Sequence, residues 1–218
     1  MERSETLQIA EIFKSIQGES TWAGLPCVFV RTAGCNLRCV WCDTAYARDG
    51  GTPMTVDEIL QRVRELDCKL VELTGGEPLL QAATPVLARR LQEAGHTVLV
   101  ETSGERPIEV LPEGVIRIMD LKCPDSGECE RNRLENIRHL KRCDEVKFVL
   151  ASRRDYEWAR AQIAAHELAA KVNAVLLSVA FGRLEPAQAV KWMLDDKLPA
   201  RFQLQAHKFI WPPETKGV

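Results

Sequence analysis

The chain carries three cysteines within the segment CNLRCVWC, at Cys35, Cys39 and Cys42. In a reducing compartment, thiols clustered in this way are more often metal ligands or catalytic groups than disulfide partners. An iron–sulfur cubane normally takes four thiolates, so three leave one iron open to an exogenous ligand. A structural zinc site is the alternative, but zinc motifs pair C-x-x-C with a second Cys or His pair, which this spacing lacks. The segment therefore predicts a reactive iron–sulfur site.

A second segment with chemical potential is TGGEP at Thr74–Pro78. Two adjacent glycines let bare backbone approach a ligand closely. On its own such a segment is typical of an ordinary turn. Its position one predicted strand after the cysteine loop favours a ligand-binding role instead.

The elements that must position these segments alternate along the chain. Apolar and β-branched runs predict strands at 7–13, 28–32, 70–74, 97–101, 115–120, 145–150, 174–178 and 201–205. Helical periodicity predicts helices at 84–94, 133–141, 155–170 and 186–194, and a capping box of Thr55 and Glu58 starts an earlier one. This alternation predicts one α/β domain built on a parallel sheet with right-handed crossovers.

Composition limits the classes of function. The chain has 218 residues, of which 45% are hydrophobic and 28% charged, and its formal net charge is −2. These values are typical of a globular protein and argue against a general nucleic-acid surface. No apolar stretch is long enough for a membrane span, and the N-terminal Met1–Thr6 lacks an apolar signal core. We therefore expect a cytoplasmic protein that binds neither nucleic acid nor membrane.

Polar residues stand where the predicted strands end. In parallel α/β sheets, ligand-binding groups collect at the carboxyl ends of the strands. We expect one shared cleft, faced by Arg31-Thr32, Thr74–Pro78, Glu101–Gly104, Asp120–Lys122 and Ser178.

The C-x-x-x-C-x-x-C spacing, with an aromatic residue before its last cysteine and a Gly-Gly-Glu-Pro segment after it, resembles the radical S-adenosylmethionine enzymes. The resemblance implies a partial, modified (β/α) barrel with mostly parallel strands, as a single core domain over 1–218 with a short N-terminal substrate-binding segment and a C-terminal tail. It also implies that Cys35, Cys39 and Cys42 hold a [4Fe-4S] cluster whose open iron binds the methionine moiety of S-adenosylmethionine. An electron from that cluster cleaves the sulfonium and yields a 5′-deoxyadenosyl radical.

Four further segments are similar to particular members of this family: IFKSIQGES at 12–20, the strand ending in Arg31, CDT at 42–44 and QAHK at 205–208. Those members turn 6-carboxy-5,6,7,8-tetrahydropterin into 7-carboxy-7-deazaguanine with loss of ammonia, in the biosynthesis of queuosine and other 7-deazapurines. The resemblance implies Mg²⁺ as a further cofactor, a flavodoxin or ferredoxin as electron donor, and a homodimer.

The substrate-binding residues implied by this resemblance suit the edge and the carboxylate of a pterin. Gln17 and Glu19 can hydrogen-bond the edge, Gly18 allows close approach, and Arg31 can bind the carboxylate through two N–H groups. A buried ion pair is the alternative for Arg31, helix capping for Glu101 and core packing for His207. The complete substrate set is Ile16, Gln17, Gly18, Glu19, Arg31, Thr74, Glu101 and His207.

The cofactor-binding residues implied are Trp41, Cys42, Asp43, Gly76, Asp120, Lys122 and Ser178. Thr44 is expected to bind Mg²⁺ together with substrate oxygens, and a plain loop hydroxyl is its alternative. No catalytic side chain is expected beyond the radical carried by the cofactor.

One departure from the pattern supports a different function. Asp120-Leu121-Lys122 stands where those members carry Ser-Pro-Lys and is similar to the activases of glycyl-radical enzymes, which are the alternative. A non-catalytic electron carrier would explain the cysteines alone, but it has no need of the Gly-Gly-Glu-Pro segment.

Five cysteines lie outside the cysteine loop. Cys27 and Cys68 stand in apolar stretches and are expected to pack as small hydrophobes. Cys123, Cys129 and Cys143 leave a second metal site open, although their spacing fits no standard motif. The chain also runs on past His207 to the end of the sequence, so a substrate contact from a terminal carboxylate is not carried over to it.

We predict that Cys39→Ala abolishes both the cluster and the cleavage of S-adenosylmethionine, because two thiolates cannot anchor a cubane that needs at least three. Iron content and release of 5′-deoxyadenosine measure the two effects. A variant that still cleaved S-adenosylmethionine would contradict the assignment of the cysteine loop.

Overall fold

The computed structural model describes residues 5–213 and 215–218, so the prediction about a leader at the N-terminus lies mostly outside the described residues. The strands are β1 (Thr6–Ile16), β2 (Pro26–Thr32), β3 (Thr52–Thr55), β4 (Leu70–Gly75), β5 (Thr97–Thr102), β6 (Ile116–Asp120), β7 (Glu145–Leu150), β8 (Ala174–Val179) and β9 (Arg201–Phe202). The α-helices are α1 (Val56–Glu65), α2 (Thr84–Glu93), α3 (Arg153–Ala165), α4 (Leu168–Lys171), α5 (Pro186–Asp195) and α6 (His207–Ile210).

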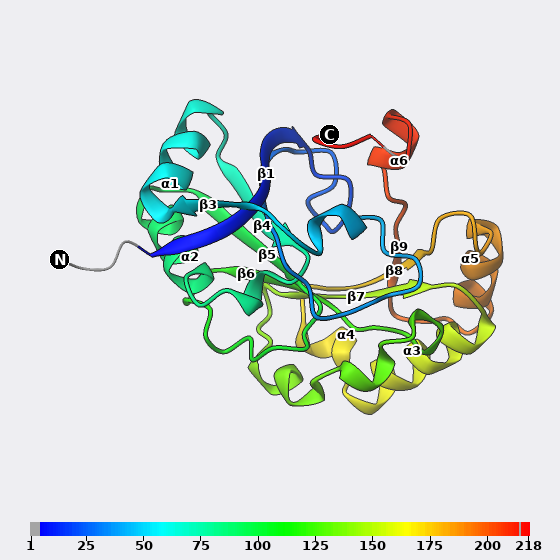
Figure 1. Ribbon diagram of the computed structural model, residues 1–218. Coiled ribbons are helices and arrows are strands. Elements are labelled where there is room, and N and C mark those ends of the chain that lie inside the picture. The colour runs from blue at the N-terminus through cyan, green and yellow to red at the C-terminus, as the bar shows by residue number, and fades with distance from the viewer. Residues whose placement is uncertain (1–4, 214) are drawn as a thin grey trace.

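All described strands form one curved sheet in the order β3-β1-β2-β4-β5-β6-β7-β8-β9 (Figure 1). From β2 to β9 neighbouring strands are parallel, whereas β1 is antiparallel to both β2 and β3. The edge strands β3 and β9 do not pair with each other, so the sheet is a partial barrel rather than a closed one. The predicted fold class is confirmed, although neither β3 nor the antiparallel edge was predicted.

The two faces of the sheet differ because successive side chains of a strand point to opposite sides. On β4, Val71 and Leu73 pack into the apolar core beneath α1 and α2, whereas Glu72 and Thr74 face the other way, into a pocket. On β7, Val146 and Phe148 belong to the core under α3, whereas Lys147 lines the same pocket. The inner face is therefore polar although it is buried.

A small apolar cluster closes the inner face below these polar residues. It contains Cys27, Phe29, Leu70, Leu99 and Ile118. Cys27 is fully buried there, as predicted for a small hydrophobe. On β4, β5 and β6 the polar residues of the inner face thus lie toward the carboxyl ends of the strands.

Several element boundaries differ from the prediction. The capping box of Thr55 and Glu58 starts α1 as expected. The helix predicted over 155–170 is interrupted between α3 and α4, where Glu167 takes a left-handed φ of 50°. The segment predicted as a helix over 133–141 forms a 3-10 helix at Leu134–His139. The last predicted strand ends at Phe202, and the chain then leaves the sheet toward α6.

The structure does not bring Cys123, Cys129 and Cys143 together into the second metal site that their spacing left open. Cys123 follows the carboxyl end of β6, whereas Cys143 is exposed and precedes the amino end of β7, which runs parallel to β6. The two thiols therefore lie at opposite edges of the sheet. Separately, no helix of the described residues is long and apolar enough to cross a membrane.

Candidate active site

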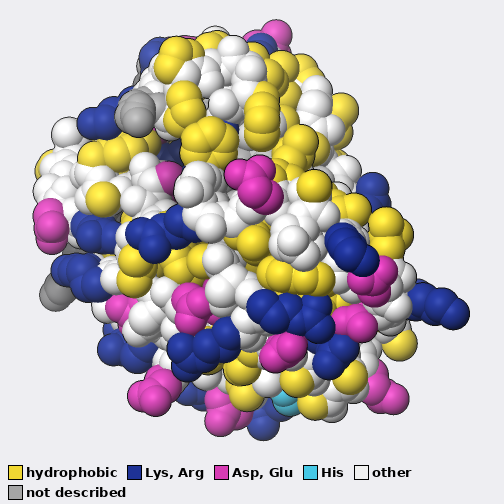
Figure 2. All heavy atoms as spheres, turned by 90° about the vertical axis from the view of Figure 1, so that its right-hand side faces the viewer, with side chains coloured by type: hydrophobic (Ala, Val, Ile, Leu, Met, Phe, Trp, Pro, Cys, Tyr) yellow, Lys and Arg dark blue, Asp and Glu magenta, His cyan; other side chains and the backbone are white. Residues whose placement is uncertain are grey.

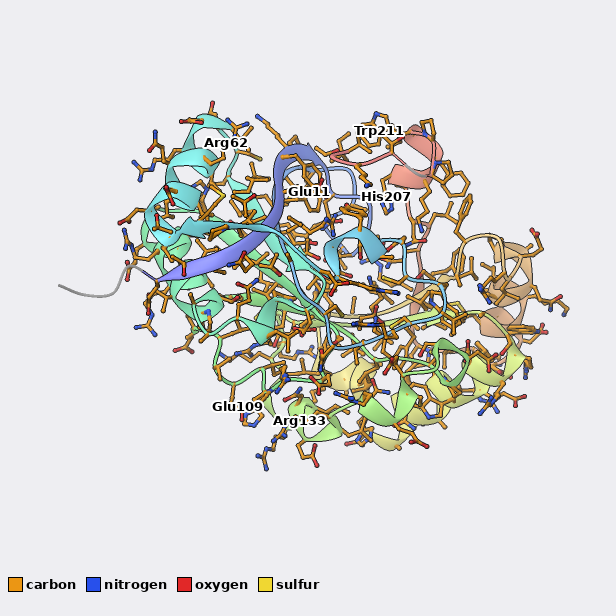
Figure 3. All side chains as sticks on the ribbon, in the orientation of Figure 1. Glu11, Arg62, Glu109, Arg133, His207 and Trp211 are labelled. Atoms are coloured by element: carbon orange, nitrogen blue, oxygen red, sulfur yellow. The ribbon has the colours of Figure 1, made fainter. Side chains whose placement is uncertain are left out.

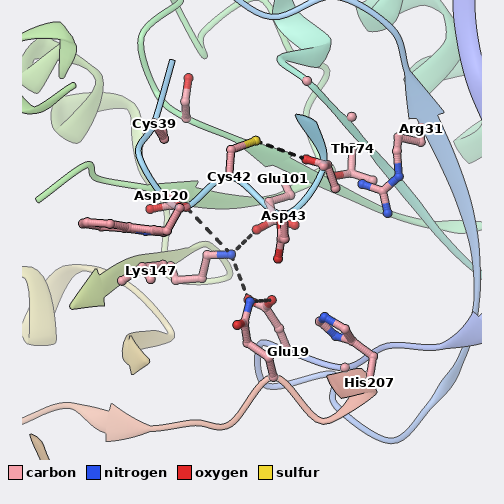
Figure 4. A pocket seen from close by; sticks show the side chains of 18 of the residues that line it. Glu19, Arg31, Cys39, Cys42, Asp43, Thr74, Glu101, Asp120, Lys147 and His207 are labelled. Atoms are coloured by element: carbon pink, nitrogen blue, oxygen red, sulfur yellow. Dashed lines mark hydrogen bonds and ion pairs between the residues drawn. The ribbon is translucent and has the colours of Figure 1, made fainter. Parts of the chain in front are cut away.

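A single pocket at the carboxyl ends of the parallel strands gathers almost every residue predicted for the site (Figure 4). Its lining includes Ile16, Gln17, Gly18, Glu19, Arg31, Cys35, Cys39, Trp41, Cys42, Asp43, Thr44, Thr74, Gly76, Glu101, Asp120, Lys122 and His207. Ser178 is not among the lining residues. Its side chain is buried on β8, and Ala180 and Phe181, just beyond the end of that strand, line the pocket instead.

The cysteine loop presents all three thiols to the pocket. Backbone hydrogen bonds hold its start, since Gly34 N donates to Ala47 O at 2.8 Å and Glu77 N donates to Gly34 O at 2.9 Å. Burial raises the pKa of the Cys35 and Cys39 thiols. Among the described residues no three Cys, His, Asp or Glu side chains are arranged around a single metal ion.

The two consecutive glycines allow the TGGEP segment to lie against the cysteine loop. A Cβ on Gly76 would collide with Gly34 O and stand 2.7 Å from Cys35 Cβ, so no other residue fits without displacing the loop. The bare backbone of Gly76 therefore lies both next to a cluster thiol and in the pocket lining.

Glu77 fixes this segment to the neighbouring strand end. Its fully buried carboxylate accepts hydrogen bonds from Leu79 N at 2.9 Å, Thr102 Oγ1 at 2.8 Å, and both Ser103 N and Ser103 Oγ at 2.8 and 2.6 Å. Both carboxylate oxygens of Glu77 are occupied by these protein donors. Glu77 therefore holds the loops after β4 and β5 together rather than contacting a ligand.

The far side of the pocket carries an ionic network that the sequence did not predict. Lys147 donates to Glu19 Oε2 at 2.8 Å, forms an ion pair with Glu101, and lies 3.9 Å from Asp120 Oδ2. Glu72, with 1% of its surface exposed, accepts a hydrogen bond from Gln17 Nε2. Period-two alternation along β4 and β7 could have shown that Glu72 and Lys147 face the pocket.

Arg31 is in an ion pair and also lines the pocket. Its Nε donates to Glu11 Oε1 at 2.7 Å, and the guanidinium lies over the Phe13 ring. Tyr46 donates to the same Glu11 oxygen at 2.6 Å. Since the ion pair uses Nε, the two terminal nitrogens of Arg31 remain suited to a bidentate contact with a carboxylate.

The C-terminal segment covers the pocket from above. Ala206 N donates to Gly18 O at 2.9 Å, and a Cβ on Gly18 would collide with the His207 ring. Gln205 Nε2 donates to Glu19 Oε1 at 2.9 Å. Burial lowers the pKa of His207, which favours the neutral imidazole.

Lys208 and Val218 extend this cover. Lys208 Nζ lies 2.9 Å from Asp43 Oδ2 and so connects α6 to the end of the cysteine loop. Val218 is also among the lining residues, so the tail, whose role the sequence left open, contributes to the pocket wall.

At the end of β6, Lys122 Nζ pairs with Asp120 Oδ2 at 2.8 Å. Burial opposes the charge of Lys122, but Asp120 outweighs it and raises the pKa of the ammonium. Asp120 Oδ1 is buried in the pocket wall and has no hydrogen-bond partner among the residues that the structure describes. Such an unpaired acceptor fits a ligand that brings hydroxyl or ammonium donors. Trp41 lies against Arg183, with the guanidinium 5.7 Å from the ring centroid.

Three comparisons with known proteins agree. Residues 29–120 match the family model of the radical SAM superfamily. The chain is 48% identical to the 7-carboxy-7-deazaguanine synthase of Koribacter versatilis, over 97% of this chain and 100% of that one. It is 46% identical to the synthase of Chlorobaculum tepidum over the full length of both. The crystal structure of QueE from Escherichia coli, 20% identical, shares the fold with a TM-score of 0.69 over 93% of this chain and 95% of that one.

We predict that Glu77→Gln lowers the free energy of unfolding by about 2 kcal/mol, because an amide offers one acceptor oxygen where four donors converge. Urea unfolding followed by circular dichroism measures the change. Glu93→Gln, on the exposed side of α2, is the matched control and should leave stability unchanged. Equal stability of the two variants would contradict the structural role of Glu77.

Proposed function

This chain belongs to the 7-carboxy-7-deazaguanine synthases of the radical SAM superfamily, and on that premise we propose a role for each group of residues in its pocket. The enzyme is a lyase that converts 6-carboxy-5,6,7,8-tetrahydropterin to 7-carboxy-7-deazaguanine in queuosine biosynthesis. Its cofactors are a [4Fe-4S] cluster, S-adenosylmethionine and Mg²⁺. The observation that carries the assignment of roles is that the cysteine loop, residues 17–19 and His207 line one pocket.

The cofactor side of the pocket comprises the cysteine loop, Gly76, Asp120 and Lys122. When bound, the cluster and S-adenosylmethionine supply the 5′-deoxyadenosyl radical. Cys35, Cys39 and Cys42 hold the cluster, and the Gly76 backbone meets the methionine end of the cofactor. Asp120 accepts hydrogen bonds from it, and Trp41 and Asp43 present backbone atoms to the adenine.

The substrate side comprises residues 16–19 together with Arg31, Thr74, Glu101 and His207. Gln17, Glu19 and Glu101 hydrogen-bond the amine-bearing edge of the pterin. Arg31 binds its carboxylate through the terminal guanidinium nitrogens. Thr44, whose hydroxyl lies 3.8 Å from Cys42 Sγ, binds Mg²⁺ where the two sides meet.

The activase and electron-carrier alternatives lose their support. Relatives over nearly the whole chain carry the synthase name. The Asp120-Leu121-Lys122 segment that suggested an activase forms an ion pair in the pocket wall, which a small-molecule enzyme can use equally well.

The partners of this enzyme belong to the same proposal. A flavodoxin or ferredoxin supplies the electron, in a cytoplasm that keeps the thiols reduced. We assign residues 1–218 to a single domain, which pairs into a homodimer. Support for the dimer comes from the side of the molecule that bears α5 and α6, where apolar side chains gather toward α6 (Figure 2) and Phe209 and Ile210 are exposed.

An anaerobic assay tests the substrate and the reaction together. Reconstituted enzyme receives S-adenosylmethionine, reductant, Mg²⁺ and the carboxylated tetrahydropterin, and mass spectrometry detects the products. We expect 7-carboxy-7-deazaguanine, and a loss of turnover when Mg²⁺ is removed by a chelator. Release of 5′-deoxyadenosine without the deazaguanine would show that the radical machinery acts on another substrate.

We predict that Arg31→Ala leaves the cluster intact but raises the KM for the pterin by at least about tenfold, since a charged hydrogen bond contributes about 1.5 to 3 kcal/mol. Arg62→Ala is the control, because Arg62 lies on the outer surface of α1, far from His207 (Figure 3). Unchanged pterin affinity in Arg31→Ala would remove Arg31 from the substrate site.

A further inference from the structure

Lys147 occupies an unusual place in the pocket wall. It lies on β7 beside Asp120 of β6 in the parallel register, and only 5% of its surface is exposed. Three carboxylates surround its ammonium: Glu19 from the turn after β1, Glu101 from the end of β5 and Asp120 from the end of β6 (Figure 4). One side chain thus connects three separate segments of the site.

The charges of this group depend on one another. Burial disfavours the ammonium, but Glu101, Glu19 and Asp120 outweigh it and raise the pKa of Lys147. Burial alone would raise the pKa of Glu19, yet the charge of Lys147 lowers it. Lys147 therefore keeps the Glu19 carboxylate ionised, and an ionised carboxylate is a pure hydrogen-bond acceptor.

The pKa of Glu72, the next carboxyl group, is shifted in the opposite direction from that of Glu19. Burial first, and then the charge of Glu101, raise its pKa well above the ordinary value. Its hydrogen-bond contact with Gln17 places it behind the same edge of the pocket as Glu19. The ammonium of Lys147 thus lies against Glu19, whose pKa is lowered, and against Glu101, while the pKa of Glu72 behind them is raised.

We propose that Lys147 is a positioning residue, which holds Glu19 and Glu101 at a fixed separation as acceptors for the amine-bearing edge of the pterin. The proposal rests on the substrate roles assigned above to these two glutamates. A pterin edge offers an exocyclic amine and ring N–H groups, all of them donors. Two carboxylates without a cation between them would repel each other and lose this arrangement.

The distances around Asp120 indicate which ligand depends on Lys147. Asp120 Oδ2 lies 2.8 Å from Lys122 Nζ but 3.9 Å from Lys147 Nζ. The cofactor side therefore keeps its own cation when Lys147 is replaced. Glu19 has no second cation within salt-bridge distance among the described residues. Replacing Lys147 therefore leaves Glu19 without a counter-charge, so we expect substrate binding to weaken more than cofactor binding.

The experiment compares Lys147→Met with wild type in the full-length, cluster-loaded enzyme. We expect the KM for the pterin to rise at least about tenfold, the KM for S-adenosylmethionine to change much less, and the absorption of the cluster to stay unchanged. Product formation by the wild type in the same assay tests the reaction itself, so its failure is distinct from failure of this proposal. An unchanged pterin KM would overturn the role of Lys147.

Arg117→Met is the matched control for a merely structural effect. Arg117 is also a buried cation on a strand, with its Nη1 3.3 Å from Asp144 Oδ2, but it does not line the pocket. We expect this variant to lower the melting temperature without raising the pterin KM. If both variants raised that KM equally, Lys147 would be a general stabilising residue and not a positioning one.

A double-mutant cycle with Glu101→Gln shows whether Lys147 acts through the glutamates. We expect Lys147→Met combined with Glu101→Gln to be no worse than the more damaging single variant, because both remove one interaction. Fully additive losses would overturn the proposal. Should Lys147→Met fail to fold, Lys147→Gln replaces it in the same measurements, because glutamine removes the charge but keeps a hydrogen-bond donor. The same rise in the pterin KM is then expected.

Discussion

Every second residue of a parallel strand must face the inside of this curved sheet, and that constraint determines what the pocket can be. The outer residues of β4 and β7 are apolar and pack under helices. Their inner neighbours, Glu72 and Lys147, are charged or ionisable and almost fully buried. Buried charges are tolerated only when paired, so the inner face had to become a connected ionic network. The binding properties of the site follow from that network.

The parts of the site that could be predicted from the sequence are short segments whose residue types and spacing indicate a function on their own. The cysteine loop, the glycines of TGGEP and Arg31 at its strand end were all placed in one cleft, where the structure has them. Lys147 and Glu72 were not predicted because each stands inside an apolar run, which indicates a strand but not which face of the sheet a given residue occupies. Their partners come from distant strands, and no local pattern records such pairs.

Element boundaries, edge strands and the C-terminal tail were also predicted incompletely from the sequence. Ser178 was placed in the cleft because the predicted strand ended there, but β8 continues to Val179 and the next residue lines the pocket. The edge strand β3 was not predicted, because it has only four residues, one of them proline, and so shows little of the apolar–polar alternation of a strand. The contribution of Val218 depends on how the tail folds back, which tertiary contacts decide.

The contact between Gly18 and His207 joins residues near the two ends of the described chain. A ribosome makes the chain from its amino end, so the turn at Gly18 and the cysteine loop emerge long before α6 does. Until α6 is made, the pocket lacks Gln205, His207 and Lys208 from its lining. The pocket can therefore be complete only after nearly the whole chain has been synthesised.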